Sequence, residues 1–143
     1  MDLPDENRPS LLRRLAAVLY DGMLLIALWM GAGAAWIALH GGNAAAPGDA
    51  FFRLYLLGVS FVFFVGFWVW GGRTLGLQAW RMRLIDANGQ KVGLVGASNR
   101  FFAALLSWLP AGAGFLWALF DRQGLTWHDR LSRTYLYLDP KRP

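Results

Sequence analysis

The residue best placed to do chemistry is Asp21, an acid inside an otherwise uncharged stretch. Residues 15–39 carry no other charge and follow directly after Arg13 and Arg14. A charged side chain at the centre of a membrane helix costs about 2.5 to 3.5 kcal/mol, so an acid in such a position is a functional hypothesis by default. A carboxylate in surroundings of low polarity can exchange a proton or a cation, because its protonation depends on burial and on nearby charges.

Three apolar runs supply the elements that must position this acid. They cover residues 15–39, 54–72 and 101–120, in a chain that is 56% hydrophobic and 16% charged. About 20 helical residues cross a 30 Å hydrocarbon core. The sequence therefore predicts a mainly α, helical integral membrane protein, folded as one domain over residues 1–143, with transmembrane helices at 15–39 and 54–72.

The third run, 101–120, differs from the other two because Pro110 stands near its midpoint, followed by two glycines. Proline removes a helical hydrogen bond and clashes with the preceding turn, which predicts a broken membrane segment. Basic residues flank both ends of the run: Arg100 precedes it, and Arg122 is the first of those that follow it. We favour two half-helices that form a re-entrant hairpin, and a kinked third span is the alternative.

The basic residues are distributed unevenly around the membrane segments. Three arginines precede the first run, and five basic residues follow the second within 73–100, whereas the loop 40–53 holds one arginine and one aspartate. This is the positive-inside pattern, which predicts cytoplasmic termini, a cytoplasmic 73–100 region and an external 41–50 loop. The net charge of +5 therefore points to the bilayer, with anionic lipid at the cytoplasmic face, and not to nucleic acid.

The cytoplasmic region is expected to contain a small β-hairpin at about residues 81–95. Residues 83–86 and 91–95 favour strands, and Asn88-Gly89 between them is typical of a tight hairpin turn. Residues 134–138 also favour a strand. These pieces predict a small cytoplasmic sheet.

Several kinds of chemistry are excluded or disfavoured by what the chain lacks. It has no cysteine, and its two histidines, His40 and His128, lie far apart. Thiol chemistry and Cys-ligated metals are excluded, and we expect no metal and no cofactor. No Ser-His-Asp spacing, HExxH or glycine-rich phosphate loop is present, so we expect that the protein is not an enzyme.

A buried Asp21 needs a partner. Arg14 lies about 10.5 Å from it along a helix, too far for a comfortable pair, so Arg73, Arg100 and Arg130 are better candidates. The alternative is that Asp21 has only a structural role. A second acid, Asp129, is expected to cap a helix or to pair with a neighbouring arginine.

Several segments together resemble a known family. They are RRLAAVLYD, GGRTLGLQAWRMRLIDANGQKVGL, Asn99-Arg100 and TWHDRLSRTYLYL. In order and spacing they are similar to the RDD family of small bacterial membrane proteins, over about residues 10–138. The arginine and two aspartates that name the family match Arg14, Asp21 and Asp129. The chain departs from the family pattern at Leu77, where a basic residue is usual, and at Arg133, where glycine is usual.

The resemblance implies a bacterial inner-membrane protein linked to transport, since some members are associated with cation/proton antiport. We therefore expect monovalent cation/proton exchange at an ion-binding or structural charge network formed by Arg14, Asp21, Arg73, Arg100 and Asp129. The alternative is a non-catalytic assembly or scaffold module in which the same residues fix helix packing. A transport pathway would require a homo-oligomer, because two or three short spans do not easily enclose one.

Overall fold

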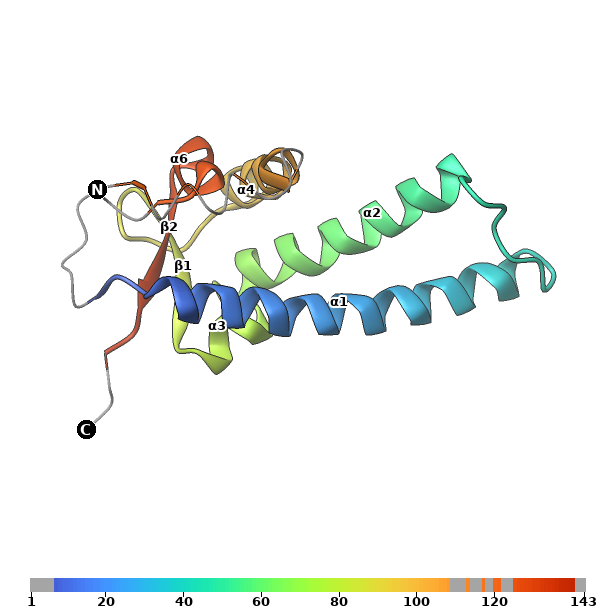
Figure 1. Ribbon diagram of the computed structural model, residues 1–143, viewed down its shortest axis with the longest axis horizontal. Coiled ribbons are helices and arrows are strands. Elements are labelled where there is room, and N and C mark those ends of the chain that lie inside the picture. The colour runs from blue at the N-terminus through green and yellow to red at the C-terminus, as the bar shows by residue number, and fades with distance from the viewer. Residues whose placement is uncertain (1–6, 109–112, 114–116, 118–119, 122–124, 141–143) are drawn as a thin grey trace.

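The structure is a computed structural model that describes residues 7–108, 113, 117, 120–121 and 125–140 (Figure 1). The helices are α1 (Leu11–Leu39), α2 (Ala50–Gly66), its π-helical continuation η2 (Phe67–Gly71), α3 (Leu75–Ala79), α4 (Leu94–Trp108) and α6 (Trp127–Ser132). The strands are β1 (Met82–Asp86) and β2 (Thr134–Leu138), which form one antiparallel sheet. The mainly helical fold with a small sheet is as the sequence predicts.

The two long helices form an antiparallel hairpin that extends away from the sheet (Figure 1). The Ser10 hydroxyl caps α1 by accepting from the Arg13 N–H, and the Asp49 carboxylate caps α2. Such caps satisfy the first N–H groups of a helix, which have no partner within it. By length and composition both Leu11–Leu39 and Ala50–Gly71 are able to cross a membrane. The structure thereby confirms that helices form over both predicted runs.

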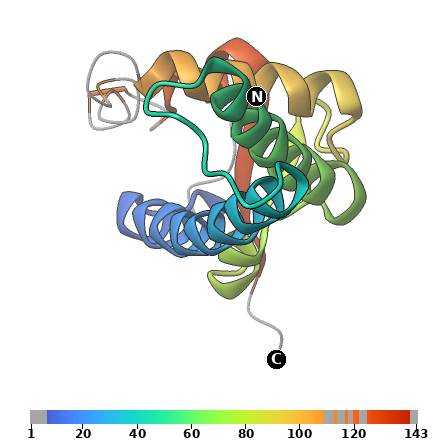
Figure 2. The ribbon, with the colours of Figure 1, turned by 90° about the vertical axis from the view of Figure 1, so that its right-hand side faces the viewer.

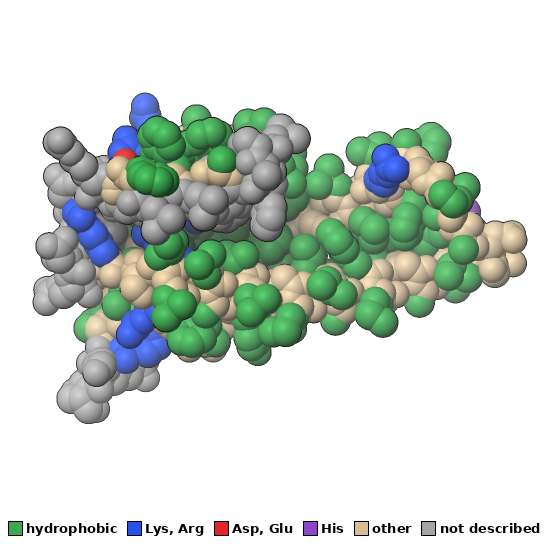
Figure 3. Space-filling view, viewed as in Figure 1, with side chains coloured by type: hydrophobic (Ala, Val, Ile, Leu, Met, Phe, Trp, Pro, Cys, Tyr) green, Lys and Arg blue, Asp and Glu red, His purple; other side chains and the backbone are tan. Residues whose placement is uncertain are grey.

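Polar side chains join the two long helices near their middle. The indole N–H of Trp29 donates to the Ser60 hydroxyl at 2.9 Å, and that hydroxyl donates to the Leu56 carbonyl. The Tyr55 hydroxyl donates to the Ala32 carbonyl at 3.3 Å. Hydrophobic side chains otherwise cover the visible face of the hairpin, and most Lys and Arg side chains in this view gather at the sheet end (Figure 3).

The sheet pairs β1 with β2, in a register that runs from Met82 opposite Leu138 to Asp86 opposite Thr134. The predicted hairpin at 81–95 is reduced to its turn and a single bridge between Ile85 and Lys91. The turn forms as expected, with the Asp86 N–H donating to the Gln90 carbonyl. The second strand does not form, because α4 begins at Leu94 and takes the last two of the residues predicted for it, 91–95.

The helix α4 begins before the predicted broken membrane segment 101–120 and continues without a break to Trp108. It lies crosswise to the long helices: Figure 1 views it end-on, and Figure 2 shows it lengthwise on the side opposite α1. The predicted break at Pro110 lies outside the described residues. Re-entry and a third span therefore both stay predictions.

The hydrophobic core lies at the sheet end, where α1, α3, α4 and the end of α2 meet β1 and β2. Met82 and Leu84 of β1 are almost fully buried there, with Ala97 of α4. Leu77 also belongs to this core, which explains an apolar residue at a position where the family pattern has a cation. The core holds several short elements against the first turns of α1.

Candidate functional site

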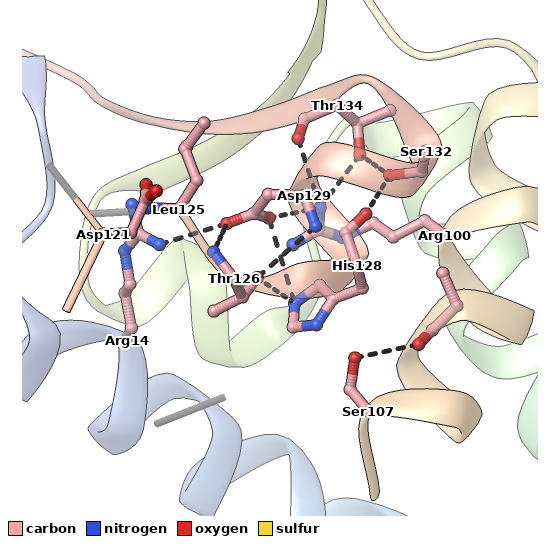
Figure 4. A network of polar contacts seen from close by, with 11 residues as sticks. Arg14, Arg100, Ser107, Asp121, Leu125, Thr126, His128, Asp129, Ser132 and Thr134 are labelled. Atoms are coloured by element: carbon pink, nitrogen blue, oxygen red, sulfur yellow. Dashed lines mark hydrogen bonds and ion pairs between the residues drawn. The ribbon is translucent and has the colours of Figure 1, made fainter. Parts of the chain in front are cut away.

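Asp129 lies at the centre of a buried polar cluster (Figure 4). A capping box holds it in the first turn of α6: the Thr126 hydroxyl accepts from the Asp129 N–H, and the Asp129 carboxylate accepts from the Thr126 N–H at 3.1 Å. Because the two residues satisfy each other's backbone donors, the local sequence at the start of α6 helps to orient this carboxylate. The expectation that Asp129 caps a helix is confirmed.

Two arginines from other helices bind the same carboxylate. Arg14 of α1 donates from Nη1 to Oδ2 at 3.1 Å, and Arg100 of α4 donates from Nη1 to Oδ1 at 2.7 Å. Both guanidinium groups are buried, and Arg100 also donates to the Thr134 hydroxyl at 2.9 Å. Asp129 therefore links α1, α4 and α6 at one point. Its ion-pair partners are two arginines distant in sequence, and not the neighbouring arginine that the sequence suggested.

The charges in this cluster are fixed by their surroundings. Complete burial alone would raise the pKa of Asp129, but attraction to Arg100 and Arg14, with the Thr126 N–H, holds it well below its usual range. Burial of the imidazole, together with the nearby Arg100 guanidinium, lowers the pKa of His128 to about 3. At neutral pH the cluster thus contains an ionised Asp129 and an uncharged His128.

Asp21 lies apart from this cluster and caps a different helix. Its Oδ2 accepts from the Thr74 hydroxyl at 2.5 Å, and its Oδ1 accepts from the Gly76 N–H at 2.8 Å. Thr74 is the N-cap of α3, and its oxygen accepts from the Leu77 N–H. The acid on α1 therefore binds the first turn of α3, where N–H groups lack partners within the helix.

These contacts correct the prediction that Asp21 meets a basic residue from another segment. Among the described residues it forms no ion pair, because a hydroxyl and a backbone N–H supply its donors instead. Arg100, one of the expected partners, is held by Asp129. Arg73 binds Asp139 at 3.3 Å, with 42% of its side chain exposed, and Arg130 binds Asp121.

The structure thus divides the five predicted site residues into three places. Arg14, Arg100 and Asp129 meet in the buried cluster, Asp21 binds α3, and Arg73 lies in a partly exposed ion pair. The sequence reasoning assigned no role to Thr74, Gly76 or Thr126. A signal was available for Thr126, because Thr-x-x-Asp has capping-box spacing.

A cavity of about 620 Å³ connects the buried cluster with Asp21, and Figure 3 shows the molecule hollowed between α1 and the elements above it. Arg14, Asp21, Arg100 and His128 line one part of it. Apolar side chains of α1, α2 and α4 line the remainder, among them Leu25, Leu57 and Leu105. Within the described residues, no group of three or more His, Asp or Glu side chains is placed to hold a metal ion.

Comparison with known proteins agrees with the two apolar helices. The model of the RDD family, whose members are small membrane proteins, matches residues 8–133, which is most of the chain. No curated protein and no solved structure gave a significant match. The matched region contains Arg14, Asp21 and Asp129. The chain belongs to the RDD family.

Proposed function

We propose that the chain is a non-catalytic integral membrane module whose Arg/Asp residues fix the packing of its helices. The observation that carries this proposal is that both carboxylate oxygens of Asp129 already have hydrogen-bond donors. Asp129 is fully buried and accepts from Arg14, Arg100 and the Thr126 N–H. A group that exchanges an ion must lose and regain its partners. Asp129 instead holds three segments together, as the structural reading of the charge network requires.

Asp21 supports the same reading. Both of its oxygens accept from the start of α3, so it docks α1 against the chain that leads into the sheet. The two long apolar helices and membership of the RDD family fit a membrane protein. The proposed role is therefore that of an assembly module, in which a membrane hairpin is fastened rigidly to a small sheet.

A stability comparison tests the proposal. Removing one member of a buried ion pair costs about 3 to 5 kcal/mol, because the other charge stays buried without a partner. We expect this loss in the free energy of unfolding for Asp129→Asn, measured by chemical unfolding in a mild detergent. Adding Arg100→Gln should cost much less than the sum of the two single changes.

The matched control is Asp139→Asn, the same substitution in the partly exposed ion pairs with Arg73 and Arg83. Such pairs contribute about 1 kcal/mol or less. Equal losses for Asp129→Asn and Asp139→Asn would contradict a packing role for the buried cluster.

Cation/proton exchange is the second candidate, and one observation favours it: Asp21 lines the cavity. Under this reading, Asp21→Asn abolishes sodium- or potassium-driven proton movement in proteoliposomes while insertion and folding stay intact. Under the packing reading, the same change lowers stability, because asparagine keeps only one acceptor for the two donors at the start of α3. A pH-sensitive dye, at matched amounts of folded protein, separates the two outcomes.

The proposed placement is the bacterial inner membrane, with several crossings, cytoplasmic termini and anionic lipid at the cytoplasmic face. The gathering of Lys and Arg at the sheet end supports this orientation (Figure 3). A homo-oligomer is also proposed. It is supported by apolar side chains on α1 that this chain leaves exposed, such as Leu19, Met23 and Met30. Size measurement in a native-like membrane tests it, and a strict monomer would contradict it.

A further inference from the structure

The cavity between α1, α2 and α4 has the size and chemistry of a ligand site. Its volume of about 620 Å³ lies within the range of about 300 to 1,000 Å³ for small-molecule pockets, which are mostly apolar with a few placed polar groups. Leu25, Leu56, Leu57, Phe64 and Leu105 are among the apolar side chains that line it. Such walls disfavour a small hydrated ion and favour a hydrocarbon chain.

The polar part of the cavity has more donors than the described residues use. Arg14 and Arg100 share one carboxylate, that of Asp129, and the hydrogen bonds they form in the described residues all come from Nη1. A guanidinium carries five N–H donors. Both side chains are buried and both line the cavity. Two cations with unused donors therefore meet the space in which a ligand would lie.

Trp68 gives an independent indication of a missing acceptor. Its side chain lines the cavity, is 8% exposed, and has an indole N–H with no hydrogen-bond partner among the described residues. The Arg100 guanidinium lies 5.7 Å from the centre of its ring. A buried donor without an acceptor is destabilising, because it has lost its hydrogen bond to water, and an oxygen of a ligand would restore that bond.

From these observations we propose that the cavity binds an acyl chain that ends in an oxyanion. The chain would lie between α1, α2 and α4, and the oxyanion at Arg14, Arg100 and Trp68. Asp21 also lines the cavity, but its oxygens already accept from Thr74 and Gly76. The inference relies on the membrane placement proposed above, and it does not depend on whether the Arg/Asp residues serve helix packing or ion exchange.

A photoreactive oleate with a mid-chain diazirine tests the site on the purified full-length chain in detergent. Saturable labelling of cavity residues, such as Leu25 and Leu57, is expected by mass spectrometry. Competition by unlabelled oleate alone identifies a fatty-acid carboxylate as the ligand group, and competition by phosphatidylglycerol identifies a phospholipid phosphate. Phosphatidylcholine should compete poorly, and equal competition by it would overturn the oxyanion part of the proposal.

Two neighbouring leucines provide a matched pair of variants for the apolar part. Leu105 lines the cavity, whereas Leu106 is 55% exposed and is not among the lining residues. Leu105→Trp fills the space and should abolish saturable labelling, while Leu106→Trp should leave it unchanged. Equal labelling of the two variants would overturn the site.

The polar part is tested by Trp68→Phe, which keeps an aromatic ring and removes the N–H donor. We expect about tenfold weaker binding of the oleate probe, the loss typical of a hydrogen bond to a charged group. Trp70→Phe is the control, since Trp70 is 81% exposed. Equal affinities of Trp68→Phe and Trp70→Phe for the probe would contradict the proposal. This test is available even if Leu105→Trp does not fold.

Discussion

Gly76 allows α1 and α3 to approach each other, and this approach brings the Asp21 carboxylate to the backbone of α3. A Cβ atom at Gly76 would lie 2.7 Å from Asp21 Cγ and would also collide with the Ala17 carbonyl oxygen. Both are parts of a packed helix that cannot move away cheaply. Glycine at this position is therefore required by the contact that Asp21 makes.

We predict that Gly76→Ala lowers the free energy of unfolding by about 3 kcal/mol, at the upper end of overpacking costs, because α1 and α3 must separate. Chemical unfolding in detergent measures the effect. Gly31→Ala is the control, since a Cβ atom there meets nothing within 4 Å and alanine favours a helix. An unchanged stability for Gly76→Ala would mean that the two helices are not held this closely.

The buried His128 predicts a pH dependence of stability. An unfolded histidine titrates near pH 6.5, whereas burial and the Arg100 charge lower the pKa of His128 to about 3 in the fold. Between these values the unfolded chain binds a proton that the folded chain does not. Stability is therefore complete above pH 6.5 and falls by about 1.4 kcal/mol per unit of pH below it.

We predict a loss of about 2 kcal/mol between pH 6.5 and pH 5, most of which disappears in His128→Gln. Unfolding in detergent from pH 7.5 to pH 5 measures it. His40→Gln, which replaces an exposed histidine, should keep the wild-type dependence. The Asp129 carboxyl, whose pKa is lowered in the fold, adds its own loss only nearer pH 4 and below, outside this range. The same pH profile in His128→Gln and the wild type would contradict a buried neutral histidine.

Sequence reasoning at the residue scale found the right charges and assigned some of the wrong partners. Asp21 is identified because a charge in an apolar context must be satisfied, whereas Arg14 and Asp129 are identified by the resemblance to the RDD family. Which groups satisfy it depends on contacts distant in sequence: Arg14 and Asp129 are 115 positions apart. The distance along one helix correctly predicted that Arg14 and Asp21 do not pair. It gave no information on the donors at the start of α3.

At the scale of elements, apolar run length predicted α1 and α2, whereas the sheet depended on competition between neighbours. The Asn-Gly turn after β1 formed as predicted, but β1 pairs along its length with β2. The capping-box spacing at Thr126 and the strand-favouring residues 134–138 were both visible in the sequence. The choice of strand partner was not visible, because it depends on where α6 brings the chain.

The junction between α6 and β2 contains a residue in an unfavourable conformation. Arg133 follows α6 with φ 51° and ψ 40°, the left-handed region in which glycine is preferred. This accounts for the glycine that the RDD pattern usually has at this position. The arginine side chain is a departure that the backbone tolerates at a cost.

We predict that Arg133→Gly stabilises the protein by about 0.5 to 1 kcal/mol, because glycine avoids the steric penalty of this conformation. Arg130→Gly is the control: it makes the same change inside α6 and should destabilise by about 1 kcal/mol. Both are measured by chemical unfolding in detergent. A destabilised Arg133→Gly would indicate that the arginine side chain contributes more than its backbone conformation costs.

At the scale of the whole molecule, the short elements lie at one end and the loop 40–49 at the other (Figure 1). Asn7 donates to the Tyr137 hydroxyl at 3.0 Å and to the Leu138 carbonyl, so the start of the described chain contacts β2. If α1 and α2 cross a membrane, the start of the described chain and β2 therefore lie on the same side of it. The positive-inside pattern predicts that this side faces the cytoplasm.

We predict that Ala46→Cys reacts with an impermeant thiol reagent from outside intact cells, whereas Asn88→Cys and Pro140→Cys do not. The native chain has no cysteine, so each variant carries a single thiol, and all three positions are exposed in the fold. Labelling after the cells are opened is the control, since Asn88→Cys and Pro140→Cys should then react. External labelling at Pro140→Cys but not at Asn88→Cys would place β1 and β2 on opposite sides of the membrane. Because their paired register cannot form across a bilayer, that result would contradict the packing of the sheet against the buried cluster as well as the orientation.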